Sequence, residues 1–167
     1  MRTIASALSF QLSIPSWWQL DWFWGAPLIV LTLLIHALGL GLINQKAARI
    51  FTRIAERRHP TGTFALVMGA TTLLATSLHA LEAGIWALSY WLLGALPDYK
   101  SAMLYSLNAI TSYGHESLML EHRWQLMGAM EALNGCLLFG LSTAFLFGII
   151  QKVWFLADSS KDASPHR

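Results

Sequence analysis

The sequence predicts an all-α integral membrane protein with three transmembrane helices, and two observations lead to this prediction. Of the 167 residues, 55% are hydrophobic and only 12% are charged, which is about half the charged share of an ordinary soluble domain. Three stretches are also apolar for the length that a crossing helix needs, about 20 residues. So few charges cannot cover the exterior of a soluble globule. We therefore treat the chain as a single membrane domain.

Composition excludes several function classes as well. The formal net charge of +2 is too small for a basic nucleic-acid-binding protein, so no nucleic acid is expected as a partner. The single cysteine, Cys136, has no partner in the chain for a disulfide, which excludes a disulfide-stapled secreted module. The high hydrophobic share excludes intrinsic disorder. Membrane lipid is the expected surrounding medium.

The first predicted span is residues 25–44. Its apolar part, residues 25–43, has no formal charge and would extend about 28 Å as a helix. Residues 1–24 contain no clear secretory signal peptide and are expected to form an interfacial segment. Aromatic residues gather in that segment immediately before the span, and they fit an anchor at the headgroup level. These residues are Trp17, Trp18, Trp22, Phe23 and Trp24.

Basic residues indicate the orientation. Residues 45–63 contain five of the eleven basic residues of the chain against one acidic residue, Glu56. Positively charged loops remain in the cytoplasm, so this loop is expected there. The N-terminus then lies outside. After two more crossings, the short polar tail of residues 156–167 lies in the cytoplasm. The localisation that follows is a multi-pass protein of the plasma membrane.

Two further spans and a shorter apolar segment follow. The second span lies within residues 64–96, a stretch that would extend about 50 Å as one helix, so we expect one tilted helix that projects beyond the bilayer. The third span covers about residues 126–155. Between them, residues 103–113 are apolar but too short to cross, which favours a re-entrant segment.

The order of span, short helix, glycine-containing turn and span resembles the two-span bacterial members of the potassium-channel superfamily. The resemblance covers residues 64–155 and rests on MLYSLNAITSYGH followed by RWQLMGAMEALNG. Tyr113 and Gly114 match the Tyr-Gly of the family's selectivity filter. Arg123, Glu131 and Gly135 fall where the family has an Arg, a Glu and a Gly.

The resemblance implies an architecture and a function. Residues 98–115 would form a re-entrant pore helix and filter loop, and residues 125–155 an inner helix. Four copies would enclose a homotetrameric pore in a bacterial inner membrane, in which backbone carbonyls replace the water shell of a monovalent cation such as K⁺. The first span lies outside the resemblance. No enzymatic activity and no cofactor other than the permeant ion is expected.

The predicted filter departs from the family pattern at three positions. Ile110 replaces a threonine and lacks its hydroxyl, Ser112 replaces a glycine, and His115 replaces an aspartate. A left-handed conformation at Ser112 would cost about 1–2 kcal/mol, so we expect the loop to avoid the standard filter conformation. Thr111 and Ser112 would instead present hydroxyls to the ion. A ring of protonated His115 side chains would repel cations below about pH 6.5.

These features predict a cation channel without firm potassium selectivity. The alternative is a non-conducting scaffold or accessory subunit that keeps the pore fold. Glu131 is expected to brace the filter through the pore-loop backbone or His115, or else to be a protonated glutamate between helices. Asn134 and Ser142 share its helical face, which is expected to line the pore cavity or to form a packing stripe. Gly135 and Gly140 are candidate hinges, with simple packing as the alternative.

A third hypothesis is a metal- or haem-binding site formed by His36, His79 and Glu82. His36 lies about 12 Å from the inner end of its predicted span, whereas His79 lies about 25 Å from the start of the second span. This difference in depth argues against a haem held by both histidines. The preferred interpretation is a local hydrogen-bonded pair of His79 and Glu82, three residues apart on one helical face.

Overall fold

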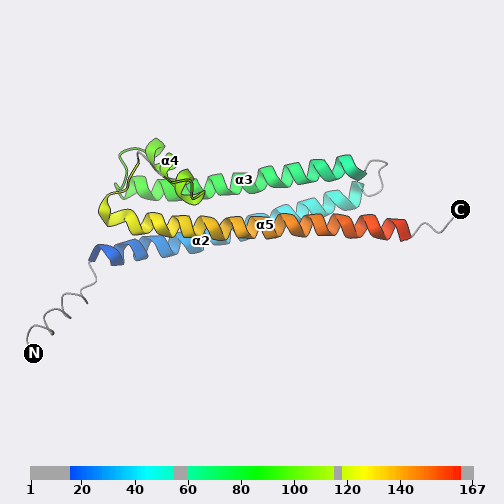
Figure 1. Ribbon diagram of the computed structural model, residues 1–167, viewed down its shortest axis with the longest axis horizontal. Helices are drawn as coiled ribbons and strands as arrows, with labels where there is room; N and C mark the ends of the chain where they lie inside the picture. Colours follow the sequence, from blue (N-terminus) through cyan, green and yellow to red (C-terminus); the bar gives the residue numbers. More distant parts are fainter. Residues whose placement is uncertain (1–15, 55–59, 115–117, 163–167) are drawn as a thin grey trace, which may run out of the picture. The chain divides into compact units, whose positions relative to one another are not determined.

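The computed structural model describes residues 16–54, 60–114 and 118–162, and every regular element in these ranges is helical. Figure 1 shows the elements in chain order. They are α2 (Ser16–Ile54), α3 (Pro60–Leu92), α4 (Tyr99–Ile110), the short 3-10 helix η1 (His122–Trp124) and α5 (Gln125–Asp162). The predicted all-α class is confirmed.

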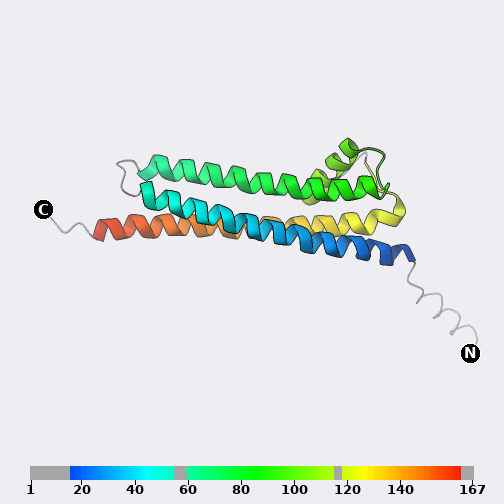
Figure 2. The same cartoon turned by 180° about the vertical axis from the view of Figure 1, so that it is seen from behind.

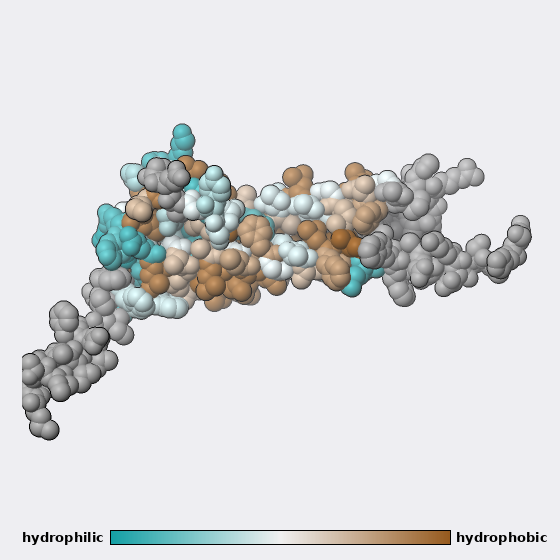
Figure 3. Space-filling view, in the orientation of Figure 1, coloured by the Kyte–Doolittle hydropathy of each residue, from teal (hydrophilic) through white to brown (hydrophobic). Residues whose placement is uncertain are grey.

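Three helices are long and apolar enough to cross a membrane within the described residues: Trp18–Arg49, Phe64–Leu92 and His122–Lys152. Large apolar side chains are exposed along all three, such as Leu38 on α2, Leu73 on α3 and Phe147 on α5. Figure 3 shows brown, hydrophobic side chains covering much of the helical surface on the face in view. Exposed apolar surface of this kind suits contact with lipid, which supports a multi-pass membrane protein.

The first helix is longer than the predicted first span. α2 begins at Ser16, includes the aromatic cluster, and continues through Lys46 and Arg49 to Ile54. Its 39 residues correspond to about 58 Å, so it extends well beyond a hydrocarbon core of about 30 Å. Residues 45–54 are rich in good helix formers and contain no glycine or proline, so nothing in them ends the helix at the membrane surface.

The chain divides into two compact units. Among the described residues, unit 1 comprises residues 16–31, 83–114 and 118–135, and unit 2 comprises residues 32–54, 60–82 and 136–162. The three long helices contribute a segment to each unit. α4 and η1 belong to unit 1 alone.

The core of unit 1 brings α3, α4 and α5 together. Trp86 and Tyr90 of α3 pack with Tyr105 of α4 and with Met127 and Met130 of α5, all buried. The rings of Tyr90 and Tyr105 meet edge to face, with centroids 5.3 Å apart. α4 is therefore packed between two spanning helices.

The core of unit 2 is smaller. Leu40 and Ile43 of α2 pack with Ala75 of α3, and Leu78 and Phe145 cover this group. The segments of α2 and α3 in this unit lie side by side in both views (Figures 1 and 2). Gly39 of α2 packs closely against Leu78 of α3, because a Cβ atom at Gly39 would lie 2.7 Å from the Leu78 methyl carbons.

The start of α4 is explained by its N-cap. Asp98 is extended, its Oδ1 accepts a hydrogen bond from the Ser101 amide at 2.9 Å, and its Oδ2 accepts one from the Ser101 hydroxyl at 2.8 Å. The first of these bonds satisfies an amide hydrogen that the first turn of a helix leaves without a partner. The backbone hydrogen bond from Ser101 is the main reason that the pKa of Asp98 lies below its ordinary value of 3.8.

The cap predicts a pH-dependent stability. Because the folded-state pKa of Asp98 is depressed, its stabilisation is fully present above about pH 4 and is lost as the pH falls through the lowered pKa. We expect Asp98→Ala to lower the thermal midpoint at neutral pH and to match the wild type at strongly acidic pH. Thermal unfolding in detergent across this range measures the difference. Glu121→Ala is the control, because Glu121 is exposed and its side chain makes no capping hydrogen bond; a wild-type difference that persisted in acid would contradict the prediction.

The ends of α3 and α4 share one motif. At the end of α3, Gly94 has a φ of +66° and the Ala95 amide donates to the Tyr90 carbonyl at 2.9 Å. At the end of α4, Ser112 has a φ of +54° and the Tyr113 amide donates to the Asn108 carbonyl at 3.0 Å. Both are Schellman caps, in which the residue after the C-cap is left-handed. Ser112 adopts this conformation although its side chain disfavours it, because the capping bonds stabilise it. The expected departure from the standard filter conformation stays a prediction.

Candidate functional site

Glu131 lies at the centre of unit 1. Its side chain is fully buried, and its Oε2 accepts a hydrogen bond from the Tyr90 hydroxyl of α3 at 2.8 Å. Its Oε1 contacts the Ser106 hydroxyl of α4, which also lies 2.7 Å from the carbonyl oxygen of Ala83. The Glu131 brace, meaning Glu131 with Tyr90 and Ser106, thus joins α3, α4 and α5. Its partners are these two side chains rather than the loop backbone.

The hydrogens in this brace can be counted. Tyr90 and Ser106 each carry one hydroxyl hydrogen, yet three contacts need one: Tyr90 to Glu131, Ser106 to Glu131 and Ser106 to the Ala83 carbonyl. A protonated Glu131 carboxyl supplies the third by donating to Ser106. The sequence left two alternatives for Glu131, a brace and a protonated glutamate between helices. The hydrogen count indicates that both describe the same arrangement.

Gly135 contacts the end of α4. A Cβ atom at this position would lie 2.8 Å from the carbonyl carbon and 2.9 Å from the Cα of Ile110, and it would also overlap the Ile110 carbonyl oxygen. Glycine is therefore required for the close approach of α5 to the last residue of α4. A Cβ atom at Gly140, in contrast, would have no neighbour within 4 Å. A specific contact therefore supports the packing interpretation of Gly135, and no such contact exists at Gly140.

The predicted filter residues fall into two groups. Ile110 is 1% exposed and belongs to the core, whereas Thr111, Ser112, Tyr113 and Gly114 are exposed. Gly114 has a φ of +92°, a backbone conformation that glycine adopts without strain. His115 lies outside the described residues. Among the described residues of the predicted filter, residues 111–114 are therefore the ones presented at the surface of a single chain.

The three candidate pore-lining residues are not at the surface. Glu131 and Asn134 are fully buried in unit 1, and Ser142 is buried in unit 2. In a single chain this burial fits the packing alternative for the helical face that they share, and the pore-lining alternative stays a prediction. Arg123 is exposed and pairs with Glu121 at 2.8 Å between its Nε and a carboxylate oxygen. A groove of about 340 Å³ lies beside the exposed turn and is lined in part by the small residues Gly128, Ala129 and Ala132.

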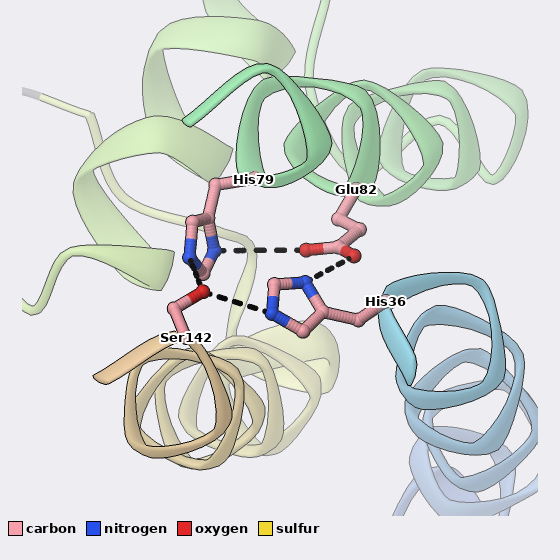
Figure 4. Close-up of polar contacts among 4 residues, drawn as sticks. All are labelled: His36, His79, Glu82 and Ser142. Atoms are coloured by element: carbon pink, nitrogen blue, oxygen red, sulfur yellow. Dashed lines mark hydrogen bonds and ion pairs between the residues drawn. The ribbon is translucent and has the colours of Figure 1, made fainter. Parts of the chain in front are cut away.

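Unit 2 contains a second buried polar group, which Figure 4 shows as a closed cycle. His36 Nδ1 lies 2.8 Å from Glu82 Oε1, and His36 Nε2 lies 3.0 Å from the Ser142 hydroxyl oxygen. His79 Nε2 lies 3.0 Å from the same Ser142 oxygen, and His79 Nδ1 lies 3.6 Å from Glu82 Oε2. We call these four residues the polar cycle. α2 supplies His36, α3 supplies His79 and Glu82, and α5 supplies Ser142.

The polar cycle corrects the predicted depths of the histidines. Their rings lie 4.8 Å apart between centroids, and the closest partner of Glu82 is His36 rather than the local His79. The depth difference disappears because α2 extends to Ile54 and α3 begins at Pro60, beyond the predicted span ends. The objection to a haem now rests on a different fact. Two imidazoles in contact leave no space for a macrocycle between them.

Sequence reasoning missed Asp21. This carboxylate on α2 is fully buried in unit 1, and neither of its oxygens has a hydrogen-bond partner among the described residues. Its position inside the run of tryptophans, with Trp22 directly after it, was the available signal. A carboxylate in such an apolar run is costly unless it is buried for a reason.

Comparison with protein-family models, with curated proteins and with solved structures found no match for this chain. The proposals below therefore rest on its own residues and geometry.

Proposed function

We propose that this multi-pass membrane protein forms a homotetrameric pore that conducts monovalent cations through the exposed turn of residues 111–114. One observation carries the proposal. α4 and its turn are held between two apolar spanning helices by the Glu131 brace and the Gly135 contact, while the turn itself stays exposed. A short helix fixed inside a membrane unit and ending in an exposed, glycine-containing turn suits a filter that needs neighbouring copies to close it.

The chemistry of the turn suits weak binding of a monovalent cation by neutral oxygen ligands. A permeating ion exchanges water for oxygen ligands, and Thr111 and Ser112 add hydroxyl oxygens to the backbone carbonyls of the turn. No acidic side chain occurs in residues 110–115, so the binding would be weak enough for the ion to leave. The groove beside the turn, with its small residues on α5, allows a neighbouring helix to approach closely.

A second candidate function is a non-conducting scaffold with the same assembly. The Schellman cap favours it, because the carbonyls of Leu107, Asn108 and Ala109 already accept hydrogen bonds from the amides of residues 111–113. Carbonyls bonded in this way face back along α4. A scaffold would keep the brace and the tetramer but pass no ion.

Cation flux into liposomes separates the two functions. We expect the reconstituted wild type to carry K⁺ and Na⁺ above the rate of empty liposomes, and Gly114→Ala to reduce this flux at least about tenfold. Alanine at a φ of +92° strains the turn, although space for its Cβ is open. Gly69→Ala is the matched control, because Gly69 also has open space but lies in the middle of α3. A tetramer without flux at neutral and acidic pH would support the scaffold, and a monomer would contradict both functions.

A further inference from the structure

The polar cycle is a costly group that the proposed pore does not use. Within apolar spanning segments it places one carboxylate and two imidazoles, with Glu82 and His36 fully buried and His79 12% exposed. Ionisable residues inside membrane helices are expensive and mark function. Phe139 of α5 stacks on His79 with ring centroids 4.4 Å apart, so the orientation of this imidazole is held by packing as well.

The cycle lacks one hydrogen. Each neutral imidazole carries one N–H, Ser142 carries one O–H and an ionised Glu82 carries none, so three hydrogens must serve four contacts. The contact that lacks a hydrogen is the one between His79 Nδ1 and Glu82 Oε2. These two buried atoms face each other at 3.6 Å, and neither has a hydrogen-bond partner among the described residues. Two facing acceptors attract a cation.

We propose that His36, His79 and Glu82 bind a divalent transition metal ion, with Zn²⁺ as the best fit. One ligand atom from each residue lies within 4.8 Å of the others, close enough to contact a single ion. In a tetrahedral site with bonds of about 2.1 Å, ligand atoms lie about 3.4 Å apart. This value falls between the two observed separations, 2.8 Å from Glu82 Oε1 to His36 Nδ1 and 3.6 Å from Glu82 Oε2 to His79 Nδ1. Two imidazoles and one carboxylate select zinc or its neighbours rather than Mg²⁺ or Ca²⁺, which prefer oxygen ligands.

Metal binding would replace the His36–Glu82 hydrogen bond and keep both hydrogen bonds of the cycle to Ser142. With both Nδ1 atoms and Glu82 on the ion, each imidazole carries its hydrogen on Nε2, and Ser142 accepts both N–H bonds with its two lone pairs. The Ser142 hydroxyl then donates to its own helix, as the neighbouring Thr143 does to the Phe139 carbonyl at 2.8 Å. Ser142 is thus a positioning residue that fixes the tautomer of both ligands. A fourth coordination position stays open.

Metal binding to the purified full-length protein, without an affinity tag, tests the proposal. After chelation, we expect Zn²⁺ to bind at one ion per chain, and Co²⁺ to give the intense visible absorption of tetrahedral coordination. Glu82→Gln keeps the size of the side chain but removes the ligand charge, so Zn²⁺ affinity should fall by about 100-fold or more. Ser142→Ala keeps all three ligands and should weaken binding by about 10–100-fold.

Two controls keep this test specific. Thr143→Ala removes an adjacent hydroxyl that bonds only to its own helix, and His122→Ala removes an exposed histidine of unit 1. Both should bind Zn²⁺ like the wild type. Should Glu82→Gln fail to fold, the Ser142→Ala affinity and the Co²⁺ spectrum decide. The proposal would be overturned if the wild type bound no Zn²⁺, or if the cycle took up protons but no metal ion. Equal Zn²⁺ affinity of Ser142→Ala and Thr143→Ala would overturn it as well.

Discussion

We expect Gly135→Ala to lose at least about 2 kcal/mol of stability, the range of overpacked cores, and to release the end of α4. The added Cβ would meet three backbone atoms of Ile110. Backbone atoms cannot rotate away as a flexible side chain does, so α4 or α5 must move. Ile110 is 1% exposed and ends α4 directly before the exposed turn. The displacement would therefore reach residues 111–114.

The matched control is Gly140→Ala, five residues along the same helix. No atom lies within 4 Å of a Cβ at Gly140, so alanine there should be neutral or stabilising by up to about 1 kcal/mol through helix propensity. Thermal unfolding of both variants in the same detergent isolates the contact, because both gain the same propensity. Equal midpoints for the two variants would contradict the close approach of α5 to Ile110.

The second large effect is expected at Glu131. Glu131→Ala should cost about 2–4 kcal/mol, because it opens a cavity and leaves the buried Tyr90 hydroxyl without its acceptor. Glu131→Gln should remain close to the wild type. Its amide oxygen accepts from Tyr90 and its NH₂ donates to Ser106, as the protonated carboxyl does.

Thermal midpoints of the two Glu131 variants, together with protease sensitivity of the loop after α4, measure these effects. Leu133→Ala is the control for truncation on the same helix, because Leu133 is 61% exposed and belongs to neither core. If Glu131→Gln were as unstable as Glu131→Ala, the carboxyl would be ionised in the folded protein. The hydrogen count for the brace would then be wrong.

Local features explain what could be predicted from sequence. Three apolar runs predict three long helices. A segment surrounded by lipid must satisfy its backbone hydrogen bonds internally, and this requirement depends only on the segment's own residues. Pro97 and Asp98 predict both the end of α3 and the start of α4, because a proline disfavours helix before it and an aspartate caps the next one. Glu131 was singled out from sequence as a buried carboxyl, but the expected partners were the loop backbone or His115, whereas the partners found are Ser106 and Tyr90.

The left-handed Ser112 illustrates the limit of a purely local energy argument. The intrinsic cost of this conformation leaves out the hydrogen bonds that offset it. The amides of Ser112 and Tyr113 donate to carbonyls three and five residues earlier, and these bonds form only once α4 ends at Ile110. Where a helix ends is itself decided by packing, here by the contact of Ile110 with Gly135.

The sequence alone determined that this chain has three apolar spans, a short capped helix between the last two, and a few ionisable residues inside the apolar segments. Only the tertiary structure decided that His36, His79 and Ser142 come together in one cycle with Glu82. They lie 18 residues before the end of α2, 19 after the start of α3 and 20 before the end of α5, hence at matching distances along the three helices. A helix end misplaced by ten residues shifts a side chain by about 15 Å, whereas a hydrogen bond tolerates only a few tenths of an ångström.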